Sequence, residues 1–313
     1  MSKISVFGSF MIDNVATMDR FPEAGETVIG KTLGIYFGGK GANQCVSLAR
    51  LGANTSMIGM VGNDQNGKDY VDLFKKENIN VDNVYFTNDA LTGIAQIQIN
   101  KDSQNRIAVI PGANHLFLDQ QFEDAKNDIK SSDYVVFQLE MDFTITAKIM
   151  EFCKENHVKI VLNPAPAVKL SDEVLSGVDY IIPNETELGI VAGLPTNNDE
   201  EIKEACISLY KRGVKHVIVT LGSRGALVYD EDGFRLISSY HVKAVDTVAA
   251  GDSFVGAFTY SLSNGKSIND AIMFANGMGA LTVQVKGAIP SLHKLKEVEE
   301  FIASHEPLEI KPF

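Results

Sequence analysis

Residues 246–254 combine two aspartates with a run of small side chains, a pattern that suits anion binding beside a proton acceptor. Ala249, Ala250 and Gly251 lie directly before an apolar pattern with helical spacing, so their backbone amides would begin a helix. Free amides and the positive end of a helix dipole stabilise negative charge, such as that of a phosphoryl group in transfer. Asp252 could then accept a proton from an attacking hydroxyl. An ordinary capped junction, in which Asp252 only complements the helix dipole, is the alternative.

A second glycine-rich helix start lies at residues 38–43. Gly39 and Lys40 precede an apolar helical face that Gly52 would end. The helix dipole disfavours a lysine at this position, so Lys40 indicates an anionic or polyhydroxyl ligand nearby. Asn43 has the donor and acceptor groups that match a hydroxyl. A plain turn followed by a polar helix face explains the same residues equally well.

Several other polar residues follow predicted strands or begin predicted helices. They are Asp13, Glu140, Asn184 and the glycine-rich segment 220–225. Glu187 lies one helical turn after Asn184, and oxygen ligands in this arrangement suit Mg²⁺ through water. A helix cap with glutamate at its third position is the alternative, as is a plain tight turn for residues 220–225. Because ligands bind at the carboxyl ends of strands in α/β sheets, one cleft could hold all these residues.

Residues 25–32 match the P-loop pattern G-x-x-x-x-G-K-[ST] letter for letter. That pattern requires a buried strand before it and a helix after it. Here a proline precedes the match, and the residues that follow are β-like and interrupted by Gly34. We therefore interpret the match as a coincidence, and a P-loop NTPase that uses Lys31 is the competing hypothesis.

The composition is that of a globular chain with a large core, since 45% of the 313 residues are hydrophobic and 22% are charged. The net charge of −12 argues against a nucleic-acid or anionic membrane partner, so small substrates are expected. Three widely separated cysteines indicate neither a disulfide framework nor a zinc site, and they fit a reducing cytoplasm. We expect no signal segment and no membrane-spanning helix, because the apolar runs are too short.

From residue 119 onward, helical and strand patterns alternate, which predicts a mainly parallel sheet covered by helices on both faces. The predicted helices span 68–78, 119–131, 144–157, 199–212, 251–264, 268–285 and 293–304. The predicted strands span 4–8, 55–61, 134–139, 159–162, 180–182 and 216–221, followed by an antiparallel pair at 225–229 and 235–237. Short strands within 19–37 and a hairpin within 94–110 could form a small separate β layer.

The chain closely resembles the ribokinase family of carbohydrate kinases, and the motifs that carry this likeness are spread along its length. They are Gly8-Ser9 with Asp13, Pro22-x-x-Gly25-Glu26-Thr27, Gly38 to Gln44, Asn163-Pro164-Ala165-Pro166, Pro183 to Glu187, Thr220 to Gly225, Asp246 to Asp252 and Lys286-Gly287-Ala288. The resemblance implies one three-layer α/β domain over residues 1–313. It also implies a small β-sheet lid, formed by two insertions near 14–38 and 92–112, that excludes water and often pairs in a homodimer.

The resemblance further implies an ATP-dependent sugar kinase in which Asp252 deprotonates the primary hydroxyl of the sugar. The amides of Ala249, Ala250 and Gly251 would hold the phosphoryl group in transfer. The implied sugar-binding residues are Met11, Asp13, Gly39, Lys40, Asn43, Glu140 and Asp252. The implied ATP-binding residues are Asn184, Thr220, Gly222, Ser223, Arg224, Gly225, Gly251 and Asn276. Glu187 would bind Mg²⁺ through water, and the implied activating K⁺ site consists of Asp246 with oxygens around Val248, Thr282, Val285, Gly287 and Ser291.

One residue departs from the pattern of ribokinases that take D-ribose. These usually have an asparagine two residues before the aspartate, whereas this chain has Met11, as in deoxyribokinases. A thioether cannot donate a hydrogen bond and would leave a buried 2-hydroxyl poorly paired, so the resemblance favours 2-deoxy-D-ribose. The alternatives are D-ribose, or another sugar such as fructose, with Met11 as a simple packing substitution. A non-catalytic sugar or nucleotide sensor is disfavoured because Asp252 and Lys40 are both present.

Overall fold

The structure is a computed structural model that describes residues 2–102 and 104–313. Its large sheet contains β1 (Lys3–Phe7), β4 (Asn54–Gly62), β5 (Asn80–Thr87), β8 (Tyr134–Phe137), β9 (Lys159–Leu162), β10 (Tyr180–Ile181), β11 (His216–Thr220), β12 (Ala226–Asp230), β13 (Gly233–Ile237) and β14 (Ile310–Pro312). The described residues place these ten strands in the order β14-β13-β12-β11-β10-β9-β8-β1-β4-β5. Neighbours from β5 to β11 are parallel, and β12, β13 and β14 add an antiparallel edge.

Helices cover both faces of the large sheet. On one face lie α1 (Lys40–Arg50), α2 (Gln65–Lys76), α8 (Ala250–Ser263), α9 (Ile268–Thr282) and α10 (Leu295–Ala303). On the other lie α3 (Asp119–Lys130), α4 (Phe143–Glu155), α5 (Asp172–Leu175), α6 (Glu185–Ala192) and α7 (Asp199–Lys211). The strands are apolar on both sides because alternate residues point to opposite faces: Val136 packs in the first core, and Val135 and Phe137 pack in the second.

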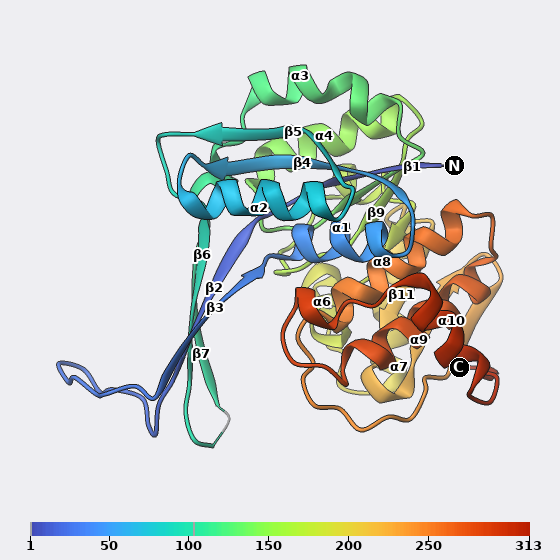
Figure 1. Ribbon diagram of the computed structural model, residues 1–313. Coiled ribbons are helices and arrows are strands. Elements are labelled where there is room, and N and C mark those ends of the chain that lie inside the picture. Colours follow the sequence, from blue (N-terminus) through green and yellow to red (C-terminus); the bar gives the residue numbers. More distant parts are fainter. Residues whose placement is uncertain (1, 103) are drawn as a thin grey trace.

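A second sheet of four strands lies beside this three-layer body and extends away from it (Figure 1). Its strands are β3 (Thr32–Gly38), β2 (Met11–Thr17), β6 (Gly93–Ile99) and β7 (Asn105–Ile110), in that order. The central pair β2 and β6 is parallel, and the two outer pairs are antiparallel. We call this element the small sheet. Many of its apolar side chains are exposed, among them Leu33, Ile35, Ile107 and Val109.

The structure confirms the predicted three-layer, mainly parallel α/β architecture and the separate small β layer. Two predictions differ in detail. Asp13 lies inside β2, where it pairs with Tyr36 of β3, whereas the sequence placed it just after a strand. Residues 18–31 form no regular strand, so the strands predicted within 19–37 reduce to β3 alone.

Candidate active site

Two adjoining cavities lie at the carboxyl edge of the large sheet. The first, of about 460 Å³, is lined by four acidic side chains, Asp13, Glu140, Glu187 and Asp252, and we call it the acidic cavity. Its apolar wall comes from the small sheet, through Ala95, Ile97, Ile107 and Val109. The second, of about 410 Å³, lies between the ends of β10 and β11, residues 239–251 and α9, and we call it the outer cavity.

The two cavities meet at residues that line both of them. These shared residues are Asn184, Thr220, Thr247 and Gly251. Gly251 lies in the first turn of α8, next to Asp252. A ligand in the outer cavity therefore reaches a ligand in the acidic cavity at the start of α8, beside the carboxylate predicted to be a base.

Asp252 is buried, and amide groups from α1 hold both of its carboxylate oxygens. Asn43 Nδ2 donates to Oδ2 at 2.9 Å, and Gln44 Nε2 donates to Oδ1 at 3.0 Å. An ionised carboxylate can only accept hydrogen bonds, so the nitrogen of each amide must face it. Asn43 Oδ1 is buried, and no described residue donates a hydrogen bond to it. This oxygen is thus an unpaired acceptor on a residue that lines the acidic cavity.

The start of α8 has the geometry of an anion site. Its N-cap residue Ala249 has φ 60°, a left-handed conformation that an L-alanine adopts only at a cost, and it has no side-chain oxygen to cap the helix. A Cβ added to Gly251 would meet no atom within 4 Å, so a ligand can approach the backbone closely there. The structure therefore places Ala249, Ala250 and Gly251 at a helix N-terminus that has no side-chain cap, where the Ala250 amide donates to the Thr247 carbonyl at 3.3 Å.

Lys40 is the only cation among the described residues that line the acidic cavity. Burial by itself would lower the pKa of Lys40, but the charges of Asp252, Glu140 and Glu187 outweigh that effect and raise it. The ammonium group therefore stays protonated at neutral pH. It supplies the positive charge that the surrounding carboxylates and an anionic ligand require.

Glu140 is held in place by the segment between β1 and β2 and by the start of α1. Its Oε2 accepts hydrogen bonds from the Ser9 hydroxyl and, at 2.9 Å, from the backbone amide of Lys40. Burial raises the pKa of Glu140, while Lys40 acts in the opposite direction. Gly39 at this turn has φ 89°, and a Cβ there would lie 2.8 Å from the Met11 amide nitrogen. Only glycine fits, so the turn brings α1 directly against the base of the small sheet.

Asp13 and Met11 project from β2 into the acidic cavity. Burial, together with the charges of Glu140 and Asp252, raises the pKa of Asp13 to about 6. Met11 is 3% exposed, and Asn114 Nδ2 lies 3.7 Å from its sulfur. The structure thus places Met11 at the wall of the cavity, with no hydrogen-bond donor of its own to offer a ligand.

Asn184 and Glu187 form the reciprocal helix cap that was the alternative explanation for this pair. Asn184 Oδ1 accepts from the Glu187 amide, and Glu187 Oε2 accepts from the Asn184 amide, both at 2.8 Å. Glu187 nevertheless lines the acidic cavity, and burial raises the pKa of its carboxyl. The cap uses only Oε2 of Glu187. Its Oε1 takes no part in the cap, which fits a carboxylate that binds Mg²⁺ through water.

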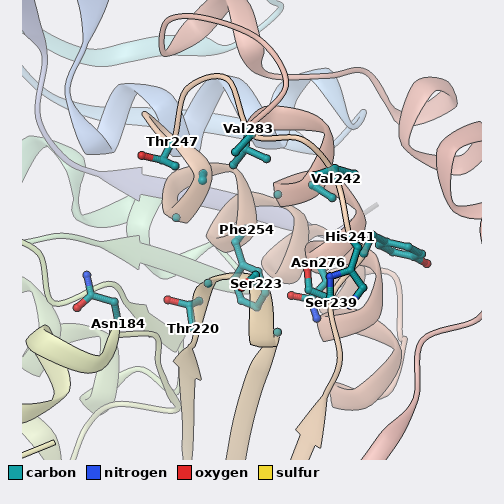
Figure 2. Close-up of a pocket in the computed structure, with 18 of the residues that line it drawn as sticks. Asn184, Thr220, Ser223, Ser239, His241, Val242, Thr247, Phe254, Asn276 and Val283 are labelled. Carbon is teal, nitrogen blue, oxygen red and sulfur yellow. The ribbon is translucent and has the colours of Figure 1, made fainter. Parts of the chain in front are cut away.

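The outer cavity contains most of the predicted ATP-binding residues. Figure 2 shows Asn184 and Thr220 on one side of it and Ser239, His241 and Asn276 on the other. Asn276 Nδ2 donates to the Ser238 carbonyl at 2.9 Å. The predicted residues Gly222, Ser223 and Gly225 also line this cavity. Arg224 does not point into it, because its guanidinium pairs with Asp199 and Glu185 at the surface.

Two of the predicted K⁺ residues, Val248 and Gly287, contact Asp246 through their backbone amides. Its Oδ1 accepts from the Val248 amide at 3.1 Å, and its Oδ2 accepts from the Gly287 amide at 2.9 Å. Thr282 and Ser291 are fully buried, and the Thr282 carbonyl accepts from the Val285 amide at 3.2 Å. The donor set of these residues consists of oxygens, which suits a hard cation. The chemistry of the residues therefore fits the expected ion.

Three buried amides in this region received no role from the sequence. Gln44, Gln138 and Asn163 join Asp252 in one hydrogen-bonded group. Gln44 and Asn163 stand inside motifs that carry the resemblance, and Gln138 is a polar residue that follows an otherwise apolar strand. A polar amide at a position expected to be buried could have indicated a role for each of them. Thr247, which lines both cavities, is a fourth residue to which the sequence assigned no role.

The P-loop match is confirmed as a coincidence. Strand β3 begins at Thr32, where a P-loop requires a helix, and Lys31 pairs with Asp19 at the surface. In the part of the chain that the structure describes, no helix is long and apolar enough to cross a membrane. The same residues contain no cluster of three or more His, Cys, Asp or Glu side chains able to hold a metal ion by themselves.

Comparisons with known proteins agree with this geometry. The family described as "pfkB family carbohydrate kinase" matches residues 1–295. A ribokinase of Lactococcus lactis is 42% identical over 300 residues, which cover 96% of each chain. A deoxyribokinase of Salmonella typhi is 33% identical over 304 residues, which cover 97% of this chain and 99% of the relative.

A solved structure of Arabidopsis thaliana ribokinase, complexed with ribose and ATP, superimposes with a TM-score of 0.91 and 32% identity. The match covers 96% of this chain and 98% of the plant protein. The fold, the family match and the whole-length relatives therefore agree. The chain belongs to the pfkB family of carbohydrate kinases, and within it to the ribokinase-type enzymes that transfer a phosphoryl group to a sugar.

Proposed function

We propose that this enzyme transfers the γ-phosphoryl group of MgATP to the 5-hydroxyl of a pentose, with D-ribose as the sugar. The observation that carries the proposal is the position of Asp252, which lines the acidic cavity directly beside the point where the two cavities meet. Support for D-ribose comes from the relatives, since the Lactococcus ribokinase is more similar to this chain than the Salmonella deoxyribokinase is. The plant structure contains ribose and ATP together.

In this mechanism, the sugar occupies the acidic cavity and ATP occupies the outer cavity. Asp252 accepts the proton of the 5-hydroxyl as the 5-oxygen bonds to the γ-phosphorus. The bond from the γ-phosphorus to the bridging oxygen breaks, and ADP leaves with the electron pair. The backbone amides at the start of α8, from Ala250 onward, and the charge of Lys40 stabilise the negative charge in the transition state. Asp13, Asn43 and Glu140 bind and orient the sugar hydroxyls.

Two cations belong to the proposal. Glu187 would hold Mg²⁺ through water, and this ion would neutralise charge on the phosphate oxygens. Asp246, with carbonyl oxygens around Val248, Val285 and Gly287, would hold an activating K⁺ next to the start of α8. Thr282 and Ser291 would complete that set.

We also propose that residues 1–313 act as one domain and that the small sheet, the counterpart of the expected insertions near 14–38 and 92–112, is its lid. Ile97, Ile107 and Val109 line the acidic cavity from this sheet, so its closure would exclude water from the reacting groups. Its exposed apolar residues, such as Leu33 and Ile35, support a homodimer formed through the lid.

A second candidate substrate, 2-deoxy-D-ribose, is favoured by one specific observation. Met11 lines the acidic cavity and has no donor group for a 2-hydroxyl. The preference for 2-deoxyribose, predicted from the sequence, is therefore a second hypothesis to test against the proposal for D-ribose. Fructose is the third alternative substrate, and the experiment below includes it.

The experiment is ADP release with D-ribose, 2-deoxy-D-ribose, fructose and adenosine, each with K⁺ and with Na⁺ in its place. We expect the highest kcat/KM with D-ribose, formation of the 5-phosphate, and faster turnover in K⁺. Light scattering of the same sample tests the dimer. A protein that binds a sugar, shown by a thermal shift, but releases no ADP with any acceptor would be a sensor, and the proposed function would be wrong.

A further inference from the structure

Gln44 and Gln138 form a buried chain of amides that ends on Asp252. Gln138 Nε2 donates to Gln44 Oε1 at 2.6 Å, and Gln44 Nε2 donates to Asp252 Oδ1 at 3.0 Å. Both glutamines are fully buried. Gln44 lies in α1, and Gln138 directly follows β8, so the chain connects Asp252 to the centre of the large sheet.

Each amide in this group has only one orientation that satisfies its neighbours. Gln44 Nε2 also donates to Asn163 Oδ1 at 3.1 Å, and Asn163 Nδ2 donates to the Ile182 carbonyl at 2.9 Å. A carbonyl only accepts, so Asn163 must present its oxygen to Gln44. Gln44 must then present its nitrogen to Asn163 and Asp252, and its oxygen to Gln138. A reversed Gln44 would place its oxygen against the carboxylate.

The fold makes room for Gln138 at a cost. A Cβ at Gly8 would lie 2.3 Å from Gln138 Oε1, so the amide fits only because residue 8 is glycine. Gln138 Oε1 is buried, and no described residue donates a hydrogen bond to it. An unsatisfied buried oxygen is unfavourable, and an apolar side chain would avoid it. The benefit of Gln138 therefore lies in its donor group, which holds the Gln44 oxygen on the side away from Asp252.

We propose, on the basis that Asp252 is the catalytic base, that Gln44 is a positioning residue for Asp252 and that Gln138 keeps the Gln44 amide in the required orientation. Asn43 holds Oδ2 of Asp252 and Gln44 holds Oδ1, so the carboxylate cannot rotate away from the 5-hydroxyl. Neither glutamine lines the acidic cavity, so neither touches the sugar. Their effect reaches the reaction only through the geometry of Asp252.

The test compares Gln44→Met and Gln138→Met with Ser47→Ala. Methionine keeps the length of the side chain and removes its hydrogen bonds. Ser47 is the matched control because it is buried one turn after Gln44 on the same helix and donates to α8 at the Ser253 carbonyl without a bond to the Asp252 carboxylate. Initial rates with the sugar of highest turnover and ATP give kcat and both KM values, and thermal unfolding gives the stability of each variant.

We expect Gln44→Met to lower kcat by about 10- to 100-fold with both KM values within about threefold of wild type. Gln138→Met should lower kcat by a smaller factor, roughly 3- to 10-fold, because Gln44 keeps its bonds to Asp252 and Asn163 and loses only the donor to its oxygen. Ser47→Ala should leave kcat within about twofold. The positioning role would be wrong if Gln44→Met matched Ser47→Ala in kcat, or if it changed KM alone. Should Gln44→Met fold poorly, a Gln138→Met kcat equal to that of Ser47→Ala decides against the proposal.

Asp252→Asn is measured in parallel, so that a failure of the positioning role of Gln44 can be distinguished from a failure of the assignment of Asp252 as the base. Wild-type turnover in Asp252→Asn would overturn the assignment of the base and with it the mechanism proposed above. An inactive Asp252→Asn together with a fully active Gln44→Met would overturn the positioning role alone.

Discussion

Asn43 Nδ2 and Asp252 Oδ2 lie 2.9 Å apart although 209 residues separate them in the sequence. The oxygen of the same Asn43 amide, Oδ1, is buried and receives no hydrogen bond from any described residue. Asn43 can therefore hold the base with one end of its amide and accept a sugar hydroxyl with the other. This contact joins the two glycine-rich helix starts, α1 and α8, into one site.

Asn43→Ala should reduce kcat/KM for the sugar by about 100-fold, because it removes one hydrogen bond to the charged base and one acceptor for the substrate. The KM for ATP should stay close to wild type, since Asn43 does not line the outer cavity. Steady-state kinetics over both substrates measure this, with Ser47→Ala as the control on the same helix. Unchanged sugar kinetics would show that the Asn43 amide has no part in the reaction.

Met11→Asn should increase the ratio of kcat/KM for D-ribose to that for 2-deoxy-D-ribose by about 10-fold. An amide at this position can donate to a 2-hydroxyl, and a polar site discriminates strongly against an analogue that lacks the bonded group. Met11→Leu is the control, because it conserves volume and adds no donor. If Met11→Asn and Met11→Leu had the same ratio of kcat/KM values, residue 11 would not discriminate between sugars with and without a 2-hydroxyl.

Asp13→Asn should stabilise the ligand-free enzyme increasingly as the pH rises from 4 to 7. The pKa of Asp13 is raised from 3.8 to about 6 in the folded state, so the folded protein retains a proton that the unfolded chain releases. Stability contributed by Asp13 is therefore complete below pH 3.8 and is lost as the pH rises through about 6. The full effect corresponds to about 3 kcal/mol.

Urea unfolding of wild type and Asp13→Asn across this pH range measures the difference. The gap between the two unfolding free energies should widen towards pH 7 and level off above pH 6. A gap that is independent of pH would contradict the raised pKa.

Ala249→Gly should stabilise the fold by about 1 kcal/mol and lower kcat by several-fold. Glycine adopts φ 60° without the steric strain of alanine. It also has more backbone freedom, so the amides at the start of α8 would be less rigidly held. His157→Gly is the matched control, because His157 has φ 58° at the end of α4, away from both cavities. We expect the control to gain similar stability with unchanged kcat. Equal kinetics in both variants would mean that the strained conformation of Ala249 has no catalytic use.

Lys40→Met should lower kcat/KM by about 100-fold or more, because it removes the only cation among the described residues of the acidic cavity and leaves the carboxylates unbalanced. Lys31→Ala is the control for charge, since Lys31 belongs to the P-loop match and pairs with Asp19 at the surface. Its kinetics should remain within about twofold of wild type. A loss in Lys31→Ala comparable to that in Lys40→Met would revive the P-loop hypothesis.

The architecture could be predicted from the sequence where burial follows a short-range pattern. Helices α3, α4 and α7 were predicted within three residues of their observed ends, because their apolar faces recur every three or four residues. Strands β5 and β14 were not predicted. Most side chains of β5 are exposed or half-buried, and all those of β14 are exposed, so neither carries a strong periodic signal.

By itself, the sequence determined the family, the glycine-rich starts of α1 and α8, and the polar residues at strand ends, because backbone constraints and local spacing specify such features. Only the tertiary structure decided how distant segments meet. It placed Gln44 and Gln138 behind Asp252, turned Arg224 towards Asp199 and put Asp13 inside β2. These outcomes depend on strand order and on how α1 packs against α8, which are contacts between segments far apart in the chain. No local pattern of residue types encodes them.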